Sequence, residues 1–598
     1  MIKRHLIKTL LASLMIVSLS SCYGKTVKDN SVIFRCSGGW YTPPAFHGNS
    51  MAQGGDGTHI HFIYDSLFFF VPKTEEMIPR LGLSVIEGKD LKSLTFKIRP
   101  GVLWHDGKPF NAYDVKASFL TLYLQGWGGN LNNIEILDDY TLTFHWNQTM
   151  TIIEKRNIML EKIRVPKHLY ATWSDKAQKI LAKAKSINDM GYKNWTEKEN
   201  KINGDIQIEK SEVLQDMYKF RPDLPIGTGA FKVTHVSASE LELTKYDKSW
   251  SANVVSIDKV KLLRGPSNDV LWAFLIAGDV DASHPATPQD VAEQILKLND
   301  KTKIVTPSDY GEFGFLFNMK REPMSDLNFR KAIAHLIDKD IIRMVSSYYS
   351  KTSDNRNIPV IGSLEKKWLD KPFIDSLESY DYSPEKGISI LEKAGYKKDE
   401  DGFYTTPSGS EIKIEIASIA GYSDWVLASE SFATQLTKMG IRANVRTLEG
   451  SYFHQQLQNN EFDIASNFGS DFKMYAHPST SFGRFFDTNG YIRKASYLPE
   501  IVKDENGNKI VLQKELDLMV NSQTKTETEK PLKRLSKVAN QYLPFIPMYE
   551  KNLTVFVVDG ERVAGWPDKN DPIWTSSSSG LESLYSYLIS SGKVHKVL

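Results

Sequence analysis

A chain of 598 residues far exceeds the usual size of a single hydrophobic core, which predicts two to four domains. Its composition, 41% hydrophobic and 24% charged, is that of a soluble globular protein. The near balance of 74 basic and 72 acidic residues argues against nucleic acid as a partner, because nucleic acids are usually bound by a strongly basic face.

The N-terminus has the pattern of an export signal. A basic start, MIKRHLIK, precedes an uncharged apolar run that ends at Leu19 and is too short for a comfortable membrane span. The run closes on Leu-Ser-Ser-Cys, which resembles the lipobox of a bacterial lipoprotein, in which the cysteine is acylated before cleavage. We therefore expect a signal peptide over 1–21, a lipid on Cys22 and a spacer over 22–30; an ordinary signal with an incidental cysteine is the alternative.

Removal of the signal leaves Cys36 as the only cysteine besides Cys22, so no disulfide framework is expected. No other run reaches the roughly 18 apolar residues that a membrane helix needs. We expect a large exported chain, on the periplasmic or outer side of the cytoplasmic membrane, that meets the membrane through its N-terminal lipid alone.

Strands and helices alternate along the rest of the chain. Period-two alternation predicts strands in LTFKIRP (94–100) and DDYTLTFHW (138–146), and helical spacing predicts helices in 269–283 and 325–342. In the first of these helices we expect Val270, Phe274 and Ala277 to form the apolar face. The Lys- and Glu-rich block over about 175–212 is interpreted as surface helices or an insertion. This mixture, with further strands in 411–418, 461–468, 543–549 and 553–558, predicts an α/β or α+β class.

Motifs for catalysis are incomplete. GKT at 24–26 lacks the first glycine of a P-loop, GTGAFK at 227–232 lacks the last glycine of a dinucleotide fingerprint, and GYSDW at 421–425 is not a nucleophile elbow. His59-Ile60-His61 could place two metal ligands on one strand face, but no carboxylate cluster lies nearby. We expect no enzyme activity, no metal and no cofactor. An exported hydrolase remains a remote alternative, because two-carboxylate glycosidases leave no short signature.

GVLWHDGKPFNAYDV (101–115) resembles an acid–base site, yet local physics accounts for it. Asp106-Gly107 is a tight-turn dipeptide. Asn111 is expected to cap a following helix and Asp114 to cap in return. A catalytic role for His105 and Asp106 is therefore not favoured.

Nine segments, in order along nearly the whole mature chain, resemble the extracellular solute-binding proteins of family 5, the oligopeptide/dipeptide type that feeds ABC importers. The segments are LTFKIRPGVLWHDGKPFNAYDVKASF, ILDDYTLTF, VPKHLY, PIGTGAFKV, LIAGDVDA, FGFLFNMKREPMSDLNFRKAIAHLIDKD, YSPEKGISILEKAGY, EFDIASNFGSDF and LPFIPMY. The chain departs from the family in the long Lys/Glu-rich block before residue 225 and in SDFKMYAHP, where the family often has a shorter Asp-aromatic-x-x-Pro run.

The resemblance implies an α/β, periplasmic-binding-protein-like fold of three domains, in which two lobes close on a ligand and an extra domain packs on the first lobe. It places domain I in three parts, with the extra domain II and the second lobe, domain III, between them. The expected ranges are 31–62, 225–306 and 548–598 for domain I, 63–224 for domain II and 307–547 for domain III.

The resemblance also implies ligand-binding residues. In peptide binders of this family an aspartate holds the peptide ammonium, and Asp471 best matches it. The backbone of Phe468, Gly469 and Ser470, called the rail below, is expected to pair with the extended peptide. The other expected binding residues are Trp40 and Tyr41 from the first lobe and Trp425 from the second.

The expected function is capture of peptides and their delivery to an ABC permease and its ATPase, by a protein that is a monomer and does not bind nucleic acid. An oligosaccharide is the alternative ligand, because sugars stack on Trp and Tyr. A chaperone-like or adhesive surface lipoprotein of the same fold is a further alternative.

Overall fold

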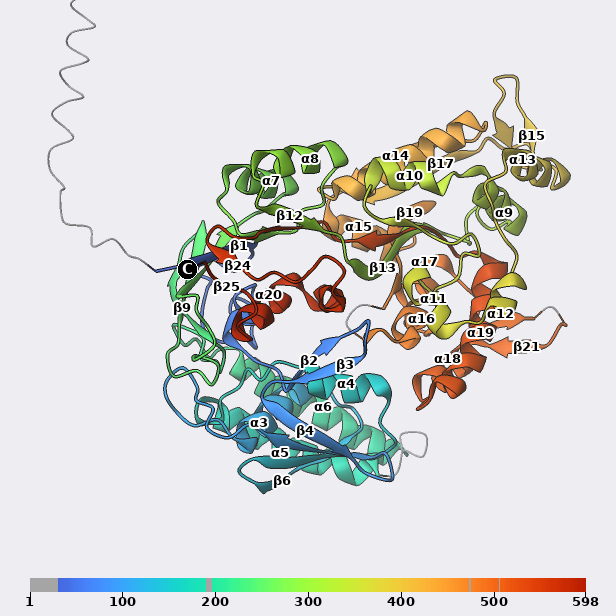
Figure 1. The fold of residues 1–598 in the computed structure, drawn as a ribbon. Coiled ribbons are helices and arrows are strands. Elements are labelled where there is room, and N and C mark those ends of the chain that lie inside the picture. The colour runs from blue at the N-terminus through green and yellow to red at the C-terminus, as the bar shows by residue number, and fades with distance from the viewer. Residues whose placement is uncertain (1–30, 190–195, 473–474, 505, 598) are drawn as a thin grey trace, which may run out of the picture.

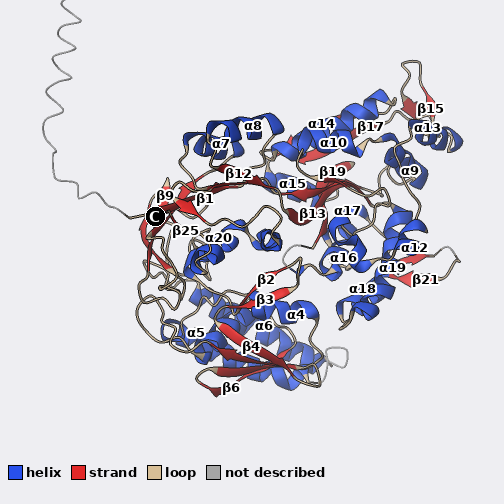
Figure 2. Cartoon of the chain, in the orientation of Figure 1, coloured by secondary structure: helices blue, strands red, loops and turns tan. Residues whose placement is uncertain are grey.

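The computed structural model describes residues 31–189, 196–472, 475–504 and 506–597. The expected signal peptide, the spacer with Cys22 and the GKT motif lie outside the described residues. Two large sheets stand side by side and a smaller one lies below them, each with helices packed against it (Figure 1; Figure 2).

The first sheet has seven strands that come from distant parts of the chain. Its core is the parallel set β1, β10 and β11, in which Cys36 pairs with both Leu262 and Ala282. In spatial order the strands are β12 (Thr302–Val305), β23 (Val555–Val558), β11 (Ala282–Ser283), β1 (Ile33–Gly38), β10 (Lys259–Arg264), β9 (Glu240–Lys245) and β8 (Phe231–Val236).

The second sheet has six strands and also holds a parallel set, β17, β18 and β19. Its long central strand β13 pairs antiparallel with β19 on one side and with β22 on the other. The order is β14 (Lys351–Thr352), β22 (Phe545–Asn552), β13 (Ser308–Phe317), β19 (Ile464–Asp471), β17 (Lys413–Ile419) and β18 (Arg442–Leu448).

The third sheet is antiparallel, and its alternating strands match the sequence prediction. Leu94, Phe96 and Ile98 are buried, as are Leu142 and Phe144, whereas Tyr140 lies in the turn before its strand and is exposed. The order is β4 (Gly82–Glu87), β5 (Ser93–Ile98), β7 (Thr141–Trp146) and β6 (Leu131–Asp138), and the hairpin β2 (Phe68–Val71)–β3 (Glu76–Pro79) precedes it.

Helices cover the sheets. With the third sheet lie α3 (Ala112–Leu124), α4 (Ile152–Leu160), α5 (Lys167–Asn188) and α6 (Glu197–Met217). The first sheet carries α2 (Ile60–Ile63), α7 (Asn268–Ala277), α8 (Gln289–Leu298) and α20 (Leu581–Ser590), and η3 (Pro572–Ser579) lies against α20, β2 and β13. The second carries α9 (Leu327–Leu336), α10 (Lys339–Ser346), α11 (Gly362–Trp368), α12 (Lys371–Asp375), α13 (Pro384–Lys393), α14 (Ser423–Lys438), α15 (Gly450–Gln458), α16 (Pro478–Phe486), α17 (Tyr491–Ser496), α18 (Leu512–Val520) and α19 (Lys525–Tyr542).

Short two-stranded pairs complete the fold: β15 (Lys397–Lys398) with β16 (Tyr404–Thr405), β20 (Ile501–Lys503) with β21 (Lys509–Val511), and β24 (Val563–Ala564) with β25 (His595–Lys596). No helix within the described ranges is long and apolar enough to cross a bilayer.

Two sequence predictions about helices differ in outcome. The Lys- and Glu-rich block does form helices, α5 and α6, and Ile180, Leu181 and Ile206 face inward. In α7 the expected apolar stripe is confirmed only in part: Phe274 packs against the buried cluster that contains Leu275, but Ala277 is exposed.

The turn-and-cap interpretation of residues 101–115 is confirmed. Gly107 has a φ of +83°, and its N–H donates to the Trp104 carbonyl at 2.8 Å. Asn111 accepts from the Tyr113 N–H at 3.0 Å, and Asp114 accepts from the Asn111 N–H at 2.9 Å, which completes the capping box of α3.

The chain crosses between the first and second sheets at two places, from β12 to β13 and from β22 to β23. There the Leu553 N–H donates to the Pro307 carbonyl at 2.9 Å and joins the two crossing segments. Such a pair of strands between two cores is where a hinge motion would act.

Candidate functional site

The parallel strands of the two large sheets bring several loops to one place. Residues after β10 and β11 in the first sheet face residues after β17 in the second, and the β22–β23 crossing passes between them. A cavity of about 440 Å³, the central cavity, lies there. Its lining includes 265–268, 284–287, 346–349, 421–422, 424–425 and 551–554, with Leu271, Asp309 and Phe468. Carboxyl ends of parallel strands are the usual place for a binding site in α/β proteins.

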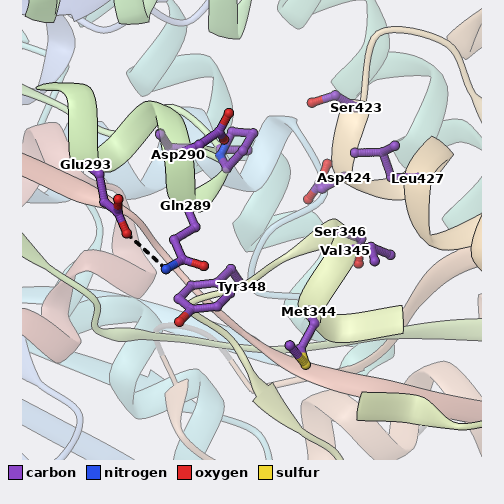
Figure 3. Close-up of a pocket in the computed structure, with 13 residues that line it drawn as sticks. Gln289, Asp290, Glu293, Met344, Val345, Ser346, Tyr348, Ser423, Asp424 and Leu427 are labelled. Atoms are coloured by element: carbon purple, nitrogen blue, oxygen red, sulfur yellow. Dashed lines mark hydrogen bonds between the residues drawn. The ribbon is translucent and has the colours of Figure 1, made fainter. Parts of the chain in front are cut away.

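A neighbouring groove of about 450 Å³ shares Thr287, Ser346, Tyr348 and Asp424 with the wall of the central cavity (Figure 3). In the groove Gln289 and Asp290 of α8 face Met344 and Val345 of α10, and Leu427 of α14 lies beyond them. Gln289 donates to Glu293 at 3.0 Å. The walls come from helices on both large sheets, so any motion of one sheet against the other changes the groove.

A buried ion pair stands in the wall of the central cavity. Lys551 Nζ lies 2.8 Å from Asp424 Oδ2, and both side chains are largely buried. Burial works against the Lys551 ammonium, but the Asp424 carboxylate outweighs it, so the pKa of Lys551 lies above its ordinary value. The Lys551 ammonium is therefore favoured at neutral pH and is held by Asp424.

The second sheet also contributes an aromatic wall. The centre of the Trp425 ring lies 5.5 Å from that of Phe468 and 5.3 Å from that of Phe313. The exposed Tyr422 ring meets the Trp425 ring edge to face at 5.4 Å. Lys551 Nζ lies 5.7 Å from the centre of the Phe468 ring. The cavity thus combines flat apolar faces with charged and amide groups, which is the usual character of a small-molecule site.

The expected rail of Phe468, Gly469 and Ser470, followed by Asp471, forms the last four residues of β19, beside β13. Arg484 binds its carbonyls, because Nη2 donates to Phe468 at 2.8 Å and Nε donates to Gly469 at 3.1 Å. Asp471 pairs with Gly311 in the sheet, and its Oδ2 lies 3.9 Å from the Arg484 guanidinium. A ligand at this rail would therefore share its partners with Arg484.

The side chain of Ser470, a residue of the rail, points into a buried polar network. Its hydroxyl donates to Glu312 at 2.9 Å, and Ser353 donates to the same carboxylate at 2.5 Å. Burial raises the pKa of Glu312 and lowers that of Lys339, which donates to the side chain of Asn357 at 2.7 Å. This network holds the strand that carries the rail.

Trp40 and Tyr41 do not line the central cavity. Trp40 is buried, its indole N–H donates to the Ser237 carbonyl at 2.9 Å, and Arg264 lies over its ring. Tyr41 is 36% exposed and lines a separate cavity of about 940 Å³ beside Tyr218. Of the expected aromatic residues, the fold brings Trp425 and Phe468 to the central cavity.

The two histidine motifs have structural surroundings. His59-Ile60-His61 lies at the start of α2 rather than on a strand, so the expectation of a strand face is wrong. Burial lowers the pKa of His59 to about 4 and that of His61 to about 3. In the described part of the chain no three His, Cys, Asp or Glu residues gather as a metal site.

His105, which follows strand β5 of the third sheet, binds the segment that leads into strand β8 of the first sheet. Its Nδ1 accepts from the Gly227 N–H at 3.2 Å, and its Nε2 lies 3.1 Å from the Gly229 carbonyl. Its backbone N–H donates to the Gly227 carbonyl at 2.9 Å. The imidazole is thus used on both nitrogens, and Asp106 binds His168 at 2.6 Å instead.

The sequence analysis missed Asp424, Lys551, His284 and Asn552 as lining residues. They lie on three separate segments, because Lys551 and Asn552 are adjacent in β22, and they belong to no local motif. The GYSDW pentapeptide, considered only as an enzyme motif, was the one local signal near them.

Comparison with known families finds one match over more than half of the chain. The family model described as "Bacterial extracellular solute-binding proteins, family 5 Middle" matches residues 76–492. The Dipeptide-binding protein of Escherichia coli (strain K12) is 24% identical over 363 residues, which cover 56% of this chain and 58% of that protein. The Periplasmic oligopeptide-binding protein OppA of Haemophilus influenzae is 22% identical over 439 residues, 68% of this chain and 70% of that protein. The first three curated relatives are matched over 58%, 65% and 47% of their own lengths.

Solved structures share the fold. A periplasmic oligopeptide-binding protein of Thermotoga maritima has a TM-score of 0.72 at 21% identity, covering 93% of this chain and 99% of that chain. Its complex with mannohexaose has a TM-score of 0.67 at 21% identity, covering 93% and 98%. AppA of Bacillus subtilis, in complex with a nonapeptide, has a TM-score of 0.64 at 18% identity, covering 95% and 99%. The expected α/β, periplasmic-binding-protein-like fold is confirmed.

Proposed function

This chain belongs to the bacterial extracellular solute-binding proteins of family 5, and from that premise we propose that it captures peptides outside the cytoplasm and delivers them to an ABC permease and its ATPase. The observation that carries the proposal is the central cavity, which lies between the strand ends of the two large sheets and beside the two crossing segments. A solute bound there would touch both sheets and favour their closed arrangement. The protein acts as a receptor and not as an enzyme.

In this proposal the domains follow the sheets. The first sheet forms domain I, the third sheet and its helices form domain II, and the second sheet forms domain III. Strand β22 pairs in the second sheet as far as Asn552. The domain III boundary therefore belongs after 552 rather than at 547.

A peptide is the first candidate ligand. Curated relatives carry the names dipeptide-binding and oligopeptide-binding protein, and the AppA structure holds a nonapeptide. Asp471 would hold the peptide ammonium next to the rail of Phe468 to Ser470, while the aromatic wall of Trp425 and Phe468 would cover side chains. Backbone pairing gives affinity with little dependence on side-chain identity.

An oligosaccharide is the second candidate, supported by the aromatic wall. Tyr422 and Phe468 each lie within ring-contact distance of Trp425 at the central cavity. The mannohexaose complex of the Thermotoga maritima protein shows that a protein of this fold can hold a sugar. Sugars stack on aromatic faces while amides and carboxylates bind their hydroxyls.

The membrane connection is part of the same proposal. Lipid on Cys22, after removal of 1–21, would tether a monomeric receptor to the membrane near its permease. Mass spectrometry of the exported protein tests this directly. A diacylglycerol adduct on a peptide that begins at Cys22 is expected, and an unmodified cysteine would contradict it.

Native mass spectrometry of the freshly purified protein tests the ligand, because closed receptors retain what they bind. A ladder of peptide masses supports the peptide proposal and a ladder of hexose masses supports the alternative. Turnover of added peptides or glycans would contradict the receptor proposal.

Asp471 has a test of its own. Asp471→Ala should weaken binding of free-amine peptides by roughly tenfold or more, since a charge-assisted hydrogen bond is lost. N-acetylated peptides of the same sequence should be affected much less, as isothermal titration would measure. Equal losses for both peptides would remove the assigned role.

A further inference from the structure

The side chain of Asn552 ends in a buried oxygen that accepts no hydrogen bond from the described residues. Asn552 is the last residue of β22, where the chain leaves the second sheet for the first. It is 8% exposed and lines the central cavity. Its Oδ1 is buried and has no partner within the described chain.

Hydrogen bonding defines the orientation of this carboxamide. Nδ2 donates to the Tyr349 carbonyl at 3.0 Å, and the backbone N–H donates to the Ser350 hydroxyl at 3.0 Å. A flipped carboxamide would place its oxygen against the Tyr349 carbonyl oxygen, which is repulsive. The atom left without a partner in this cavity-lining residue is therefore an acceptor.

Most other polar groups of the cavity wall are already paired. Asp424 and Lys551 bind each other, while Asn268 donates to Ser423 at 3.3 Å and accepts from the Ala286 N–H at 3.2 Å. Nδ1 of His284, on the opposite wall, is likewise buried and unpaired within the described chain. Burying an unpaired acceptor costs free energy, so its retention at a cavity wall suggests a partner that arrives with the ligand.

We propose that Oδ1 of Asn552 accepts a hydrogen bond from the captured solute and is a ligand-binding residue of the central cavity. The inference rests on the proposed function and adds the chemistry that the solute must supply, an N–H or O–H donor. In a peptide the donor is a backbone amide or the ammonium; in a sugar it is a hydroxyl. Because the Leu553–Pro307 bond lies next to Asn552, the contact forms directly beside the crossing segments, where closure is decided.

Two variants separate binding from scaffolding. Asn552→Leu removes both the acceptor and the donor to Tyr349. Asn552→Asp keeps the shape and, when protonated, can still donate to Tyr349 and accept from the solute. If Asn552 serves only to hold the Tyr349 carbonyl, it makes no contact with the solute. Both variants, once folded, would then bind the solute with wild-type affinity.

The matched control is Asn467→Leu. Asn467 also lies on the second sheet and is buried, but it donates to Tyr491 at 3.2 Å and does not line the cavity. It reports any general effect of removing a carboxamide from this sheet. Circular dichroism and thermal melts establish that each variant is folded before binding is measured.

The probes are a random tetrapeptide library and, separately, mannohexaose, added to protein that has been unfolded, stripped of bound solute and refolded. Bound fractions are measured by native mass spectrometry over a range of probe concentrations. For the probe that wild type retains, Asn552→Leu should bind about tenfold more weakly, which is about 1.4 kcal/mol. Asn552→Asp should recover part of this loss when the pH is lowered from 7 to 4, where about half of an ordinary aspartic acid side chain is protonated, and Asn467→Leu should match wild type.

The failures are distinguishable. Retention of a probe by wild type and by Asn552→Leu with the same affinity refutes the role of Asn552 and leaves the proposed function standing. Retention of neither probe by wild type refutes the proposed function and this inference with it.

Discussion

Replacement of His105 by glutamine should remove a defined part of the protein's sensitivity to acid. Burial lowers the pKa of His105 to about 4 from an ordinary value of 6.5, and the Gly229 carbonyl offsets this only in part. Between these two pH values the unfolded chain takes up a proton at His105 and the folded chain does not. Stability from this group is therefore complete above pH 6.5, falls as the pH falls through the window, and levels off below pH 4.

The magnitude follows from the width of the window. A difference of 2.5 pKa units, from 6.5 to about 4, at about 1.36 kcal/mol per unit corresponds to at most about 3 kcal/mol. A glutamine can still donate to the Gly229 carbonyl and accept from the Gly227 N–H, but it does not titrate. Between pH 7 and pH 4.5 the free energy of unfolding should therefore fall by about 2–3 kcal/mol less in His105→Gln than in wild type.

Urea denaturation followed by tryptophan fluorescence measures this difference, since Trp104 is the neighbouring buried residue. The quantity of interest is the change with pH, so a uniform loss of stability in the variant does not affect the result. His145→Gln is the control, because His145 is a half-exposed residue of the third sheet that binds Glu135. Parallel stability curves for wild type and His105→Gln from pH 7 to 4.5 would refute the reasoning.

The remaining predictions concern two contacts between segments. Glu75 in the β2–β3 hairpin lies 2.9 Å from Lys367 next to the second sheet. Glu75→Lys should therefore open the ligand-free protein and increase its radius of gyration in X-ray scattering, and adding Lys367→Glu should restore the wild-type value. An unchanged radius of gyration in the single variant would contradict a role of this ion pair in holding the protein closed. A methyl group on Gly227 would lie 1.8 Å from the Ile63 carbonyl oxygen, so Gly227→Ala should cost about 3 kcal/mol or more of folding stability and lower the melting temperature. Gly129→Ala is the control, because a methyl group there would meet no atom within 4 Å and should leave the melting temperature unchanged. Equal melting temperatures for the two variants would contradict the steric clash at Gly227.

Local features were predictable because their causes are local. The turn at Gly107 and the capping box of Asn111 and Asp114 depend on residues within three positions of each other, and both are confirmed. The α7 stripe was right at Phe274 and wrong at Ala277, because helical periodicity identifies an apolar face but not which neighbour covers it, and in α7 the face around Leu275 is the covered one.

The candidate site was predictable only in part. Trp425 and Phe468 do line the central cavity, whereas Trp40, which follows β1 at the corresponding edge of the first sheet, turns its indole to the Ser237 carbonyl. The assignment of Asp471 remains a prediction, and its neighbour Arg484 could not be foreseen because it comes from α16, a separate helix.

The sequence by itself determined the family, the class of fold and the local turns and caps, because these follow from short-range patterns and from segments in a recognisable order. Only the tertiary structure decided which residues meet at the central cavity. Asp424, His284 and the adjacent Lys551 and Asn552 come from three segments around two sheets, and the closure of those sheets, rather than any motif, brings them together. An unpaired acceptor such as Asn552 Oδ1 becomes visible only when every nearby donor has been placed, and that placement is a property of the folded chain.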